Sequence, residues 1–471
     1  MEITKQTIEE LHKKITAKEL SVRELVDAYI KNISENNEEL NVYLTVFDEA
    51  YINEQVLMAQ KKFDDGEATL LTGIPLSMKD VICMKGLRAT GGSKILENYK
   101  ATYDATVISK LTEHTPVFVG KTNTDEFAQG ASTENSAYGV TKNPHDTERV
   151  AGGSSGGATA SVAAEMAVAG LGSDTGGSIR EPASFCGVVG FKPTYGAVSR
   201  YGLMAMASSF DVISPTAKTV RDAEILFNAI KGKDDFDATS LDVTKEIKPV
   251  KKIGVPYSFL KEGIDEDVKT VFDTNIETLK KAGYEIVDIS IPMIEKALAV
   301  YYVLVPAEVS SNMSRYDGVK YGEKIEGKDL EDTYKKTRGQ LLGKEVKRRI
   351  MLGTYVLSAG YADQFYRNAW KVRTKIRENL ATVFTEVDMI AMPVAPTPAF
   401  KIGEKANDPM QMYLNDIFTV VANVAGIPAM SIPAGSVSRD EKSLPIGLQL
   451  IGAHGEDMTL FEVGKKFESA L

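Results

Sequence analysis

The sequence predicts an α/β protein, on three observations. Segments with the pattern of strands alternate with segments with the pattern of helices, and this alternation indicates an α/β fold. Hydrophobic residues make up 43% of the 471 residues and charged residues 25%, which is typical of a folded soluble protein and argues against extensive disorder. The chain has neither an internal repeat nor a low-complexity linker, so we expect one domain over residues 1–471.

Helices are expected at the N-terminal end. Ser21 and Glu24 have the spacing of a capping box, which marks the start of a helix. The apolar residues that follow recur on one helical face: Val22, Leu25, Val26, Tyr29, Ile30 and Ile33. Such a face indicates a helix packed on a larger body.

The region from about residue 70 to about residue 220 is rich in glycine, serine and alanine, with short apolar runs between them. Residues 115–120 predict a strand and residues 121–123 its exit. Glycine at this density costs backbone entropy, which a chain accepts where backbone must approach backbone or a ligand closely. We therefore expect the catalytic core in this region.

The remainder of the chain predicts further alternating elements. We expect helices over 219–230 and 265–282, and strands over 252–256, 286–291, 387–393, 428–433 and 446–451. Thr219 and Asp222 have capping spacing at the start of the first of these helices. Residues from about 300 to 385 carry many charges and predict a mostly helical insertion.

Charge and cysteine content exclude several classes of function. The formal net charge is −10, and an acidic chain repels phosphate backbones, so tight nucleic-acid binding by this chain alone is not expected. Cys83 and Cys186 lie far apart without ligand spacing, which favours buried reduced thiols over a metal site. The N-terminus lacks the pattern of a signal peptide and no apolar stretch is long enough to cross a bilayer, so we expect a cytoplasmic protein.

Histidine is a poor candidate for a catalytic base in this chain. The four histidines are His12, His114, His145 and His454, and none accompanies a nucleophile-elbow motif of the Gly-x-Ser-x-Gly type. A histidine triad is therefore poorly supported, and structural or surface roles are expected for all four.

Two glycine-rich runs surround serines instead: AGGSSGG at 151–157 and GSDTGGSIR at 172–180. In the second run, successive backbone N–H groups can converge on a developing negative oxygen, with Gly176 and Gly177 free to adopt unusual dihedrals. Flexible turns and phosphate-binding loops are the alternatives, although the nucleotide-binding glycine motifs are absent from both runs.

Lys79 is the candidate base, in the mainly apolar run LSMKDV at 76–81. A lysine at a strand end is often a surface residue. To accept a proton at neutral pH its pKa must fall by roughly 3 units, which burial can supply. Serine–lysine pairs are an established form of nucleophile and base.

Together, the two serine runs and the preceding lysine resemble the amidase signature family over nearly the whole chain. The resemblance implies an α/β fold with a mixed central β-sheet between α-helices. It also implies a relay in which Lys79 is the base, Ser154 passes the proton and is held by a cis peptide, and Ser178 is the nucleophile. The implied oxyanion hole uses the backbone N–H groups of four residues: Thr175, Gly176, Gly177 and Ser178. Ser178 would attack an amide, ammonia would leave, and water would cleave the ester.

Further segments resemble the branch of this family that hydrolyses glutamine within tRNA-dependent amidotransferases. They are GKTNTDEFA at 120–128, STENSAYG at 132–139, SSN at 310–312, RYDG at 315–318 and YLNDIFT at 413–419. The resemblance implies a heterotrimer with the B and C subunits of such an enzyme. The B subunit would use ATP and Mg²⁺ to amidate Glu-tRNA(Gln) or Asp-tRNA(Asn) with the ammonia, so this chain would need no cofactor, metal or membrane and would meet aminoacyl-tRNA only through the complex.

The same resemblance places glutamine against Arg349, Asp416 and Tyr301. A zwitterion needs a cation for its carboxylate and an anion for its ammonium, and the planar fork of arginine suits a carboxylate. On the residues alone, Arg349 would more simply belong to a solvated basic helix face and Asp416 to a helix cap.

Two departures from the family pattern and two other functions stay open. The family usually has methionine at Gln129 and tryptophan at His145, so a change in pocket polarity is one expectation. A stand-alone amidase acting on a small apolar amide would not need the charges of Arg349 and Asp416. A non-catalytic scaffold that binds nucleotide through its glycine-rich loops would not need Lys79 and its serines.

Overall fold

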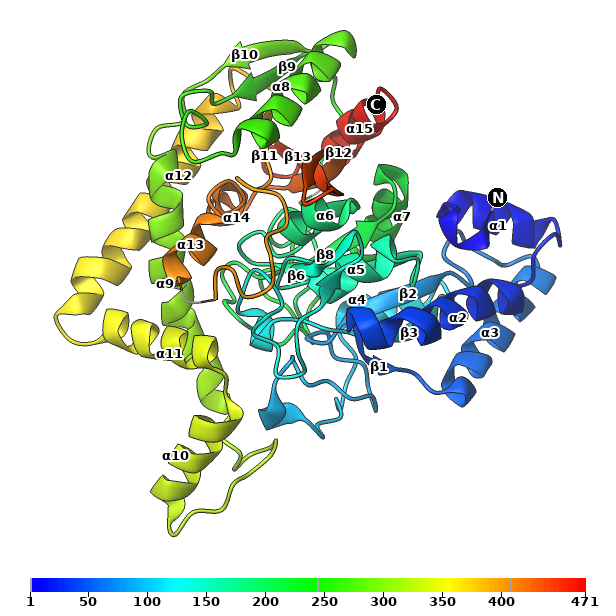
Figure 1. The fold of residues 1–471 in the computed structure, drawn as a ribbon, viewed down its shortest axis with the longest axis horizontal. Coiled ribbons are helices and arrows are strands. Elements are labelled where there is room, and N and C mark those ends of the chain that lie inside the picture. The colour runs from blue at the N-terminus through cyan, green and yellow to red at the C-terminus, as the bar shows by residue number, and fades with distance from the viewer. Residues whose placement is uncertain (1, 244, 407) are drawn as a thin grey trace.

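One 11-stranded sheet runs through the molecule, in a computed structural model that describes residues 2–243, 245–406 and 408–471 (Figure 1). The strands are β1 (Tyr43–Val46), β2 (Pro75–Lys79), β3 (Val117–Thr122), β6 (Ala169–Asp174), β7 (Val189–Lys192), β8 (Val212–Ala217), β9 (Lys252–Val255), β10 (Glu285–Asp288), β11 (Met389–Pro393), β12 (Ala429–Arg439) and β13 (Lys442–Gly452). Their order is β1-β3-β2-β6-β8-β7-β12-β13-β11-β9-β10. Strand β2 is parallel to β3 and β6, and β9 is parallel to β10 and β11, while the other pairs are antiparallel. The expected mixed sheet is confirmed.

Helices cover both faces of this sheet. They are α1 (Ile8–Thr16), α2 (Val22–Leu40), α3 (Glu49–Asp64), α4 (Thr106–Thr112), α5 (Gly156–Ala163), α6 (Arg180–Cys186), α7 (Val220–Ile230), α8 (Glu266–Lys281), α9 (Ala297–Asn312), α10 (Leu330–Leu341), α11 (Lys344–Leu357), α12 (Asn368–Val383), α13 (Pro409–Leu414), α14 (Val420–Ala425) and α15 (Asp457–Glu468). A two-stranded ribbon of β4 (Lys142–Asn143) and β5 (Asp146–Val150) lies outside the main sheet. Strands between helical layers confirm the α/β class.

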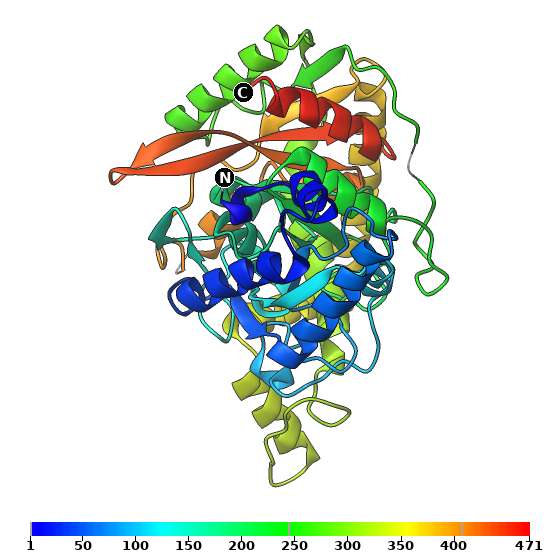
Figure 2. The same ribbon diagram turned by 90° about the vertical axis from the view of Figure 1, so that its right-hand side faces the viewer.

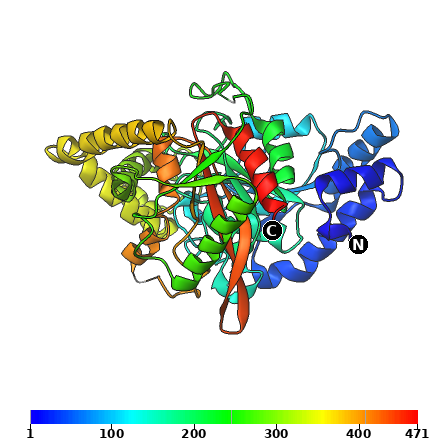
Figure 3. The ribbon, with the colours of Figure 1, turned by 90° about the horizontal axis from the view of Figure 1, so that it is seen from above.

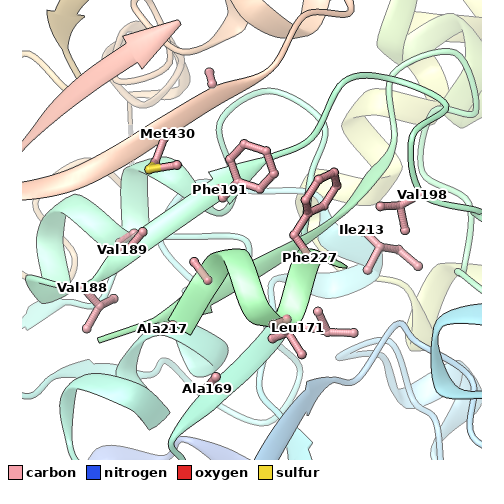
Figure 4. Packing of buried hydrophobic residues seen from close by; sticks show 14 of the residues in the cluster. Ala169, Leu171, Val188, Val189, Phe191, Val198, Ile213, Ala217, Phe227 and Met430 are labelled. Atoms are coloured by element: carbon pink, nitrogen blue, oxygen red, sulfur yellow. The ribbon is translucent and has the colours of Figure 1, made fainter. Parts of the chain in front are cut away.

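Buried aromatic and branched side chains fix the layer between the sheet and α7 (Figure 4). Phe227 of α7 packs edge-on against Phe191 of β7, with ring centroids 5.1 Å apart, and Leu171 and Ile213 of β6 and β8 are buried in the same cluster. Alternate residues of β6 point to the opposite face, where Gly172 faces Ser155 at the start of α5. At β6 the sheet is thus apolar on the side of α7 and meets the start of α5 on the other side.

Glycines in the serine-rich region allow the close approach that their density predicts. A Cβ at Gly170 of β6 would lie 2.3 Å from the hydroxyl of Ser77 in β2, and a Cβ at Gly157 would lie 2.5 Å from the carbonyl of Asn123. A larger residue would displace the Ser77 side chain in the first case and the Asn123 backbone in the second. The region therefore packs backbone against backbone around β2 and β6.

Several expected elements are confirmed and some boundaries are wrong. Ser21 and Glu24 form the capping box of α2, and Thr219 caps α7. The strand expected over 115–120 instead continues through Lys121 and Thr122, because β3 pairs with both β1 and β2 there. The strand expected over 286–291 ends at Asp288, since this edge strand pairs only with β9, which ends at Val255.

The two strands expected over 428–433 and 446–451 are the inner halves of a longer hairpin. Strands β12 and β13 stay paired out to Arg439 and Lys442, and the hairpin projects beyond the rest of the sheet (Figures 2 and 3). Asp440 and Glu441 close it with positive φ values of 49° and 62°. Alternating polar residues hid the outer half from a search for apolar runs.

The region 300–385 contains helices α9 to α12, as expected (Figure 1). Along the chain these helices connect the edge strand β10 to the inner strand β11. These helices lie on the opposite side of the molecule from α1 to α3. Because one sheet and one main hydrophobic cluster draw on residues from both ends of the chain, we propose that residues 1–471 form a single domain. Among the described residues, no helix is both long and apolar enough to span a bilayer.

Candidate active site

Lys79 ends strand β2 with a completely buried side chain. Its Nζ atom lies within hydrogen-bonding distance of three serine hydroxyls: 2.7 Å from Ser154 Oγ, 2.8 Å from Ser155 Oγ and 2.9 Å from Ser173 Oγ. The three serines come from the two glycine-rich runs singled out in the sequence. The fold therefore brings the candidate base to both runs.

Burial changes the protonation of this amine. It lowers the pKa of Lys79 to about 7, against the opposing pull of the carboxylates of Asp125, Asp174 and Asp211. A free amine is therefore well populated at neutral pH, and a free amine can accept a proton from a serine hydroxyl. The alternative of a surface lysine is wrong.

Ser154 precedes helix α5 and is completely buried, and the Gly153–Ser154 peptide is cis. The next backbone N–H, that of Ser155, donates to the carbonyl oxygen of Ser178 at 3.0 Å, and this bond joins the two glycine-rich runs. Ser178 itself is only half-buried. Of the two candidate serines, Ser178 is therefore the one that a substrate can reach.

The turn that carries Ser178 is held by the buried carboxylate of Asp174 at the end of β6. Arg180 donates to Asp174 from Nε at 2.9 Å, Asn423 donates from Nδ2 at 2.8 Å, and the N–H of Gly177 donates at 3.0 Å. Burial alone would raise the pKa of Asp174, but Arg180 holds it below its ordinary value. A fixed carboxylate thus shapes the turn without facing the solvent.

The expected oxyanion hole has three unengaged N–H groups rather than four. The N–H of Gly177 is taken by Asp174, whereas those of Thr175, Gly176 and Ser178 have no partner among the residues that the structure describes. Gly177 has φ +135°, which requires glycine, and a Cβ at Gly176 would lie 2.6 Å from the Tyr301 hydroxyl. Glycine is needed at position 176 because a side chain would collide with Tyr301, and at position 177 because the φ angle there suits only glycine.

Arg349 on helix α11 is buried, so the interpretation as a solvated basic face is wrong for this residue. Its Nε donates to Glu345 Oε1 at 2.7 Å, and its guanidinium lies 5.7 Å from the ring centroid of Tyr302 and 5.9 Å from that of Tyr413. These residues line a cavity of about 150 Å³, together with residues 130–132, 134 and 135. The cavity offers a cation in an aromatic setting.

Asp416 precedes α14, and its side chain does not cap the helix. Its Oδ2 accepts from the Tyr302 hydroxyl at 3.0 Å, and burial raises the pKa of Asp416 to about 7. Arg349 and Asp416 thus contact the same tyrosine without pairing with each other. Tyr301, expected to bind substrate, is buried beside Tyr302 and packs against Gly176.

The remaining sequence expectations have clear locations. Cys83 and Cys186 are free and buried, as expected. His145 Nε2 lies 2.9 Å from the carbonyl oxygen of Cys186, which is a structural role. Gln129 is completely buried, and neither polar atom of its amide has a partner among the described residues. Those residues also contain no cluster of three His, Cys, Asp or Glu side chains that could hold a metal ion.

The sequence did not reveal the residues outside the motifs that hold the site residues in place. Tyr302 donates to Asp416, Glu345 accepts from Arg349, and Thr419 donates to the carbonyl oxygen of Gly176 at 2.7 Å. Nothing in the sequence distinguishes Tyr302 from Tyr301, because helical phase decides which ring faces Asp416. Ser155 and Ser173 lay within the quoted motifs and could have been identified there.

Comparisons with known proteins agree with this geometry. The family model described as Amidase matches residues 24–461. The chain is 48% identical over 480 residues to the A subunit of glutamyl-tRNA(Gln) amidotransferase from Thermodesulfovibrio yellowstonii, covering 100% of this chain and 98% of the relative. Among solved structures, the A subunit of glutamyl-tRNA(Gln) amidotransferase from Thermotoga maritima is 40% identical with a TM-score of 0.80, covering 100% of this chain and 95% of that chain. A crystal structure of an amidase is 27% identical with a TM-score of 0.83, covering 99% of this chain and 100% of that chain.

Proposed function

Because the chain belongs to the amidase family, we propose that it hydrolyses glutamine as the amidase subunit of a glutamyl-tRNA(Gln) amidotransferase. The observation that carries the chemistry is the contact of the buried Lys79 amine with Ser154 at 2.7 Å. The biological setting is supported by the similarity to an A subunit of that amidotransferase, which is 48% identical over 100% of this chain and 98% of the relative.

The reaction begins with proton transfer from Ser178 to Ser154 and from Ser154 to the free amine of Lys79. The Ser178 oxygen forms a bond to the amide carbon, and the N–H groups of Thr175, Gly176 and Ser178 stabilise the oxyanion. The proton then returns from Lys79 to the leaving nitrogen, the carbon–nitrogen bond breaks, and ammonia departs. Water enters, gives its proton to the same relay, and cleaves the ester to release glutamate.

Glutamine binds as a zwitterion in this proposal. Arg349, which lines the cavity, takes the α-carboxylate. Asp416, bonded to the cavity residue Tyr302, takes the α-ammonium, and Tyr301 lies beside Tyr302. A bound ammonium would lower the pKa of Asp416 and favour its charged form. The buried charges favour this reading over a stand-alone amidase for apolar amides, which would have no use for Arg349 in a cavity.

The ammonia serves the B and C subunits of a cytoplasmic heterotrimer, in which the B subunit uses ATP and Mg²⁺ to amidate mischarged tRNA. The test is glutamine hydrolysis by the purified chain, alone and with its partners. We expect slow release of ammonia that rises when the partners bind. Full turnover by the isolated chain, with no partner recovered from the cells that make it, would favour the stand-alone amidase.

The identity of the nucleophile has its own test. Ser178→Ala should abolish hydrolysis while the protein stays folded, and an electrophilic glutamine analogue should label Ser178 in the wild type. A covalent label on Ser154 or Cys186 would contradict the relay.

A further inference from the structure

Glu181 is a buried carboxyl that the relay does not use. It lies in the first turn of α6, and its Oε2 accepts the backbone N–H of Gly153 at 3.0 Å. A Cβ at Gly152 would lie 2.6 Å from the same oxygen. The carboxyl therefore rests directly against the glycine pair that leads into Ser154.

A second carboxyl, that of Asp125, also packs against this glycine pair but accepts no hydrogen bond from it. A Cβ at Gly153 would lie 2.3 Å from Asp125 Oδ2. The oxygens of Asp125 instead accept the backbone N–H groups of Thr133 at 2.9 Å and Asn135 at 3.0 Å. Glu181, and not Asp125, thus accepts the hydrogen bond that fixes Gly153.

The second oxygen of Glu181 has no hydrogen-bond partner among the described residues. Burial raises the pKa of Glu181 well above its ordinary value, with Asp416 and Asp125 adding to the rise and the hydrogen bond from the Gly153 N–H and the charge of Lys405 opposing it. A neutral acid still accepts an N–H bond through its carbonyl oxygen. The site therefore requires an acceptor at this position and not a charge.

We propose that Glu181 is a positioning residue for Ser154: its carboxyl holds the Gly152–Gly153 turn and thereby keeps Ser154 Oγ within hydrogen-bonding distance of Lys79. This inference rests on the proposed function, because it assigns Ser154 as the relay. It predicts an effect on the proton-transfer step and not on glutamine binding.

Three substitutions separate the acceptor from the charge. Glu181→Gln keeps an acceptor oxygen at the same reach, so its kcat should stay within about threefold of wild type. Glu181→Met fills the space without an acceptor, and its kcat should fall about 10- to 100-fold with KM unchanged, because the buried Gly153 N–H loses its partner. Glu181→Asp keeps the acid but withdraws it by one methylene, and it should also lose kcat. If Glu181→Met does not fold, Glu181→Asp tests whether kcat depends on the position of the acceptor oxygen.

Asp222 on α7 supplies a matched control. It is a buried carboxyl whose Oδ1 accepts a backbone N–H, that of Ile8, at 3.0 Å and whose Oδ2 has no partner among the described residues. Asp222→Leu should lower the melting temperature and leave kcat unchanged. The inference is overturned if Glu181→Met and Asp222→Leu have equal kcat at a temperature where both are folded, or if Glu181→Gln is as slow as Glu181→Met. Absence of glutamine hydrolysis in the wild type would instead reject the proposed function itself.

Discussion

The Nζ atom of Lys79 lies 2.7 Å from Oγ of Ser154, and both residues are completely buried. This contact is the basis of the first two predictions. At that distance the amine either accepts the serine proton or merely positions the hydroxyl as a cation, and the two roles respond differently to substitution and to pH.

Lys79→Arg should be as inactive as Lys79→Ala in glutamine hydrolysis. Arginine keeps the positive charge but cannot release its proton in the physiological range. Loss of a general base lowers the rate about 10²- to 10⁴-fold, and both variants should fall by that much. If Lys79→Arg retained most of the wild-type rate, Lys79 would be only a positioning cation.

The pH dependence follows from the lowered pKa of Lys79. Below pH 7 the amine is protonated and cannot accept the serine proton, so kcat should rise about tenfold per pH unit there. Above pH 7 the free amine predominates and the profile should level off. Asp416 also ionises near pH 7 and acts in the same direction, so kcat at saturating glutamine separates the two groups. A flat kcat profile across neutrality would argue against Lys79 as the base.

Tyr302→Phe tests the contact that holds Asp416. The substitution removes the hydroxyl that donates to Asp416 while leaving the ring stacked on Tyr413, so KM for glutamine should rise about tenfold with little change in kcat. Tyr29→Phe is the control, because its hydroxyl donates at 3.0 Å to the Thr4 carbonyl in a buried position outside the site. An equal KM for Tyr302→Phe and Tyr29→Phe would remove Tyr302 from the binding site.

Gln129→Met should stabilise the protein. Both polar atoms of this amide are buried without a partner among the described residues, and each such atom costs about 1–3 kcal/mol in the folded state. Methionine has a similar length and no strong polar group, so the denaturant midpoint should increase. A lower midpoint would mean that the Gln129 amide has a partner in solution.

The chemistry of the site could be predicted from the sequence better than its surroundings. The serines lie in glycine-rich runs whose composition shows where backbone approaches backbone, and the fold brings the apolar run that carries Lys79 to both of them. Burial of Arg349 could not be predicted, because Lys344, Lys347 and Arg348 around it give the pattern of an exposed face. The edge strand β10 was predicted too long because its end depends on where its partner β9 ends. Glu181 was missed because its partner is a backbone N–H 28 residues away in the chain.

Arg349→Met separates a glutamine hydrolase from a general amidase. The substitution should raise KM for glutamine about 10- to 100-fold, because the α-carboxylate loses a charge-assisted hydrogen bond within a buried cavity. Hydrolysis of propionamide, which has no carboxylate, should not change. Glu345 would keep an ion pair with Arg348, so loss of Arg349 does not leave that carboxylate unpaired. The matched control is Lys344→Met, which removes an exposed positive charge from the same helix outside the cavity lining and should leave KM for glutamine nearly unchanged. Equal losses on glutamine and propionamide in Arg349→Met would show that Arg349 supports the fold of the site and does not select its substrate.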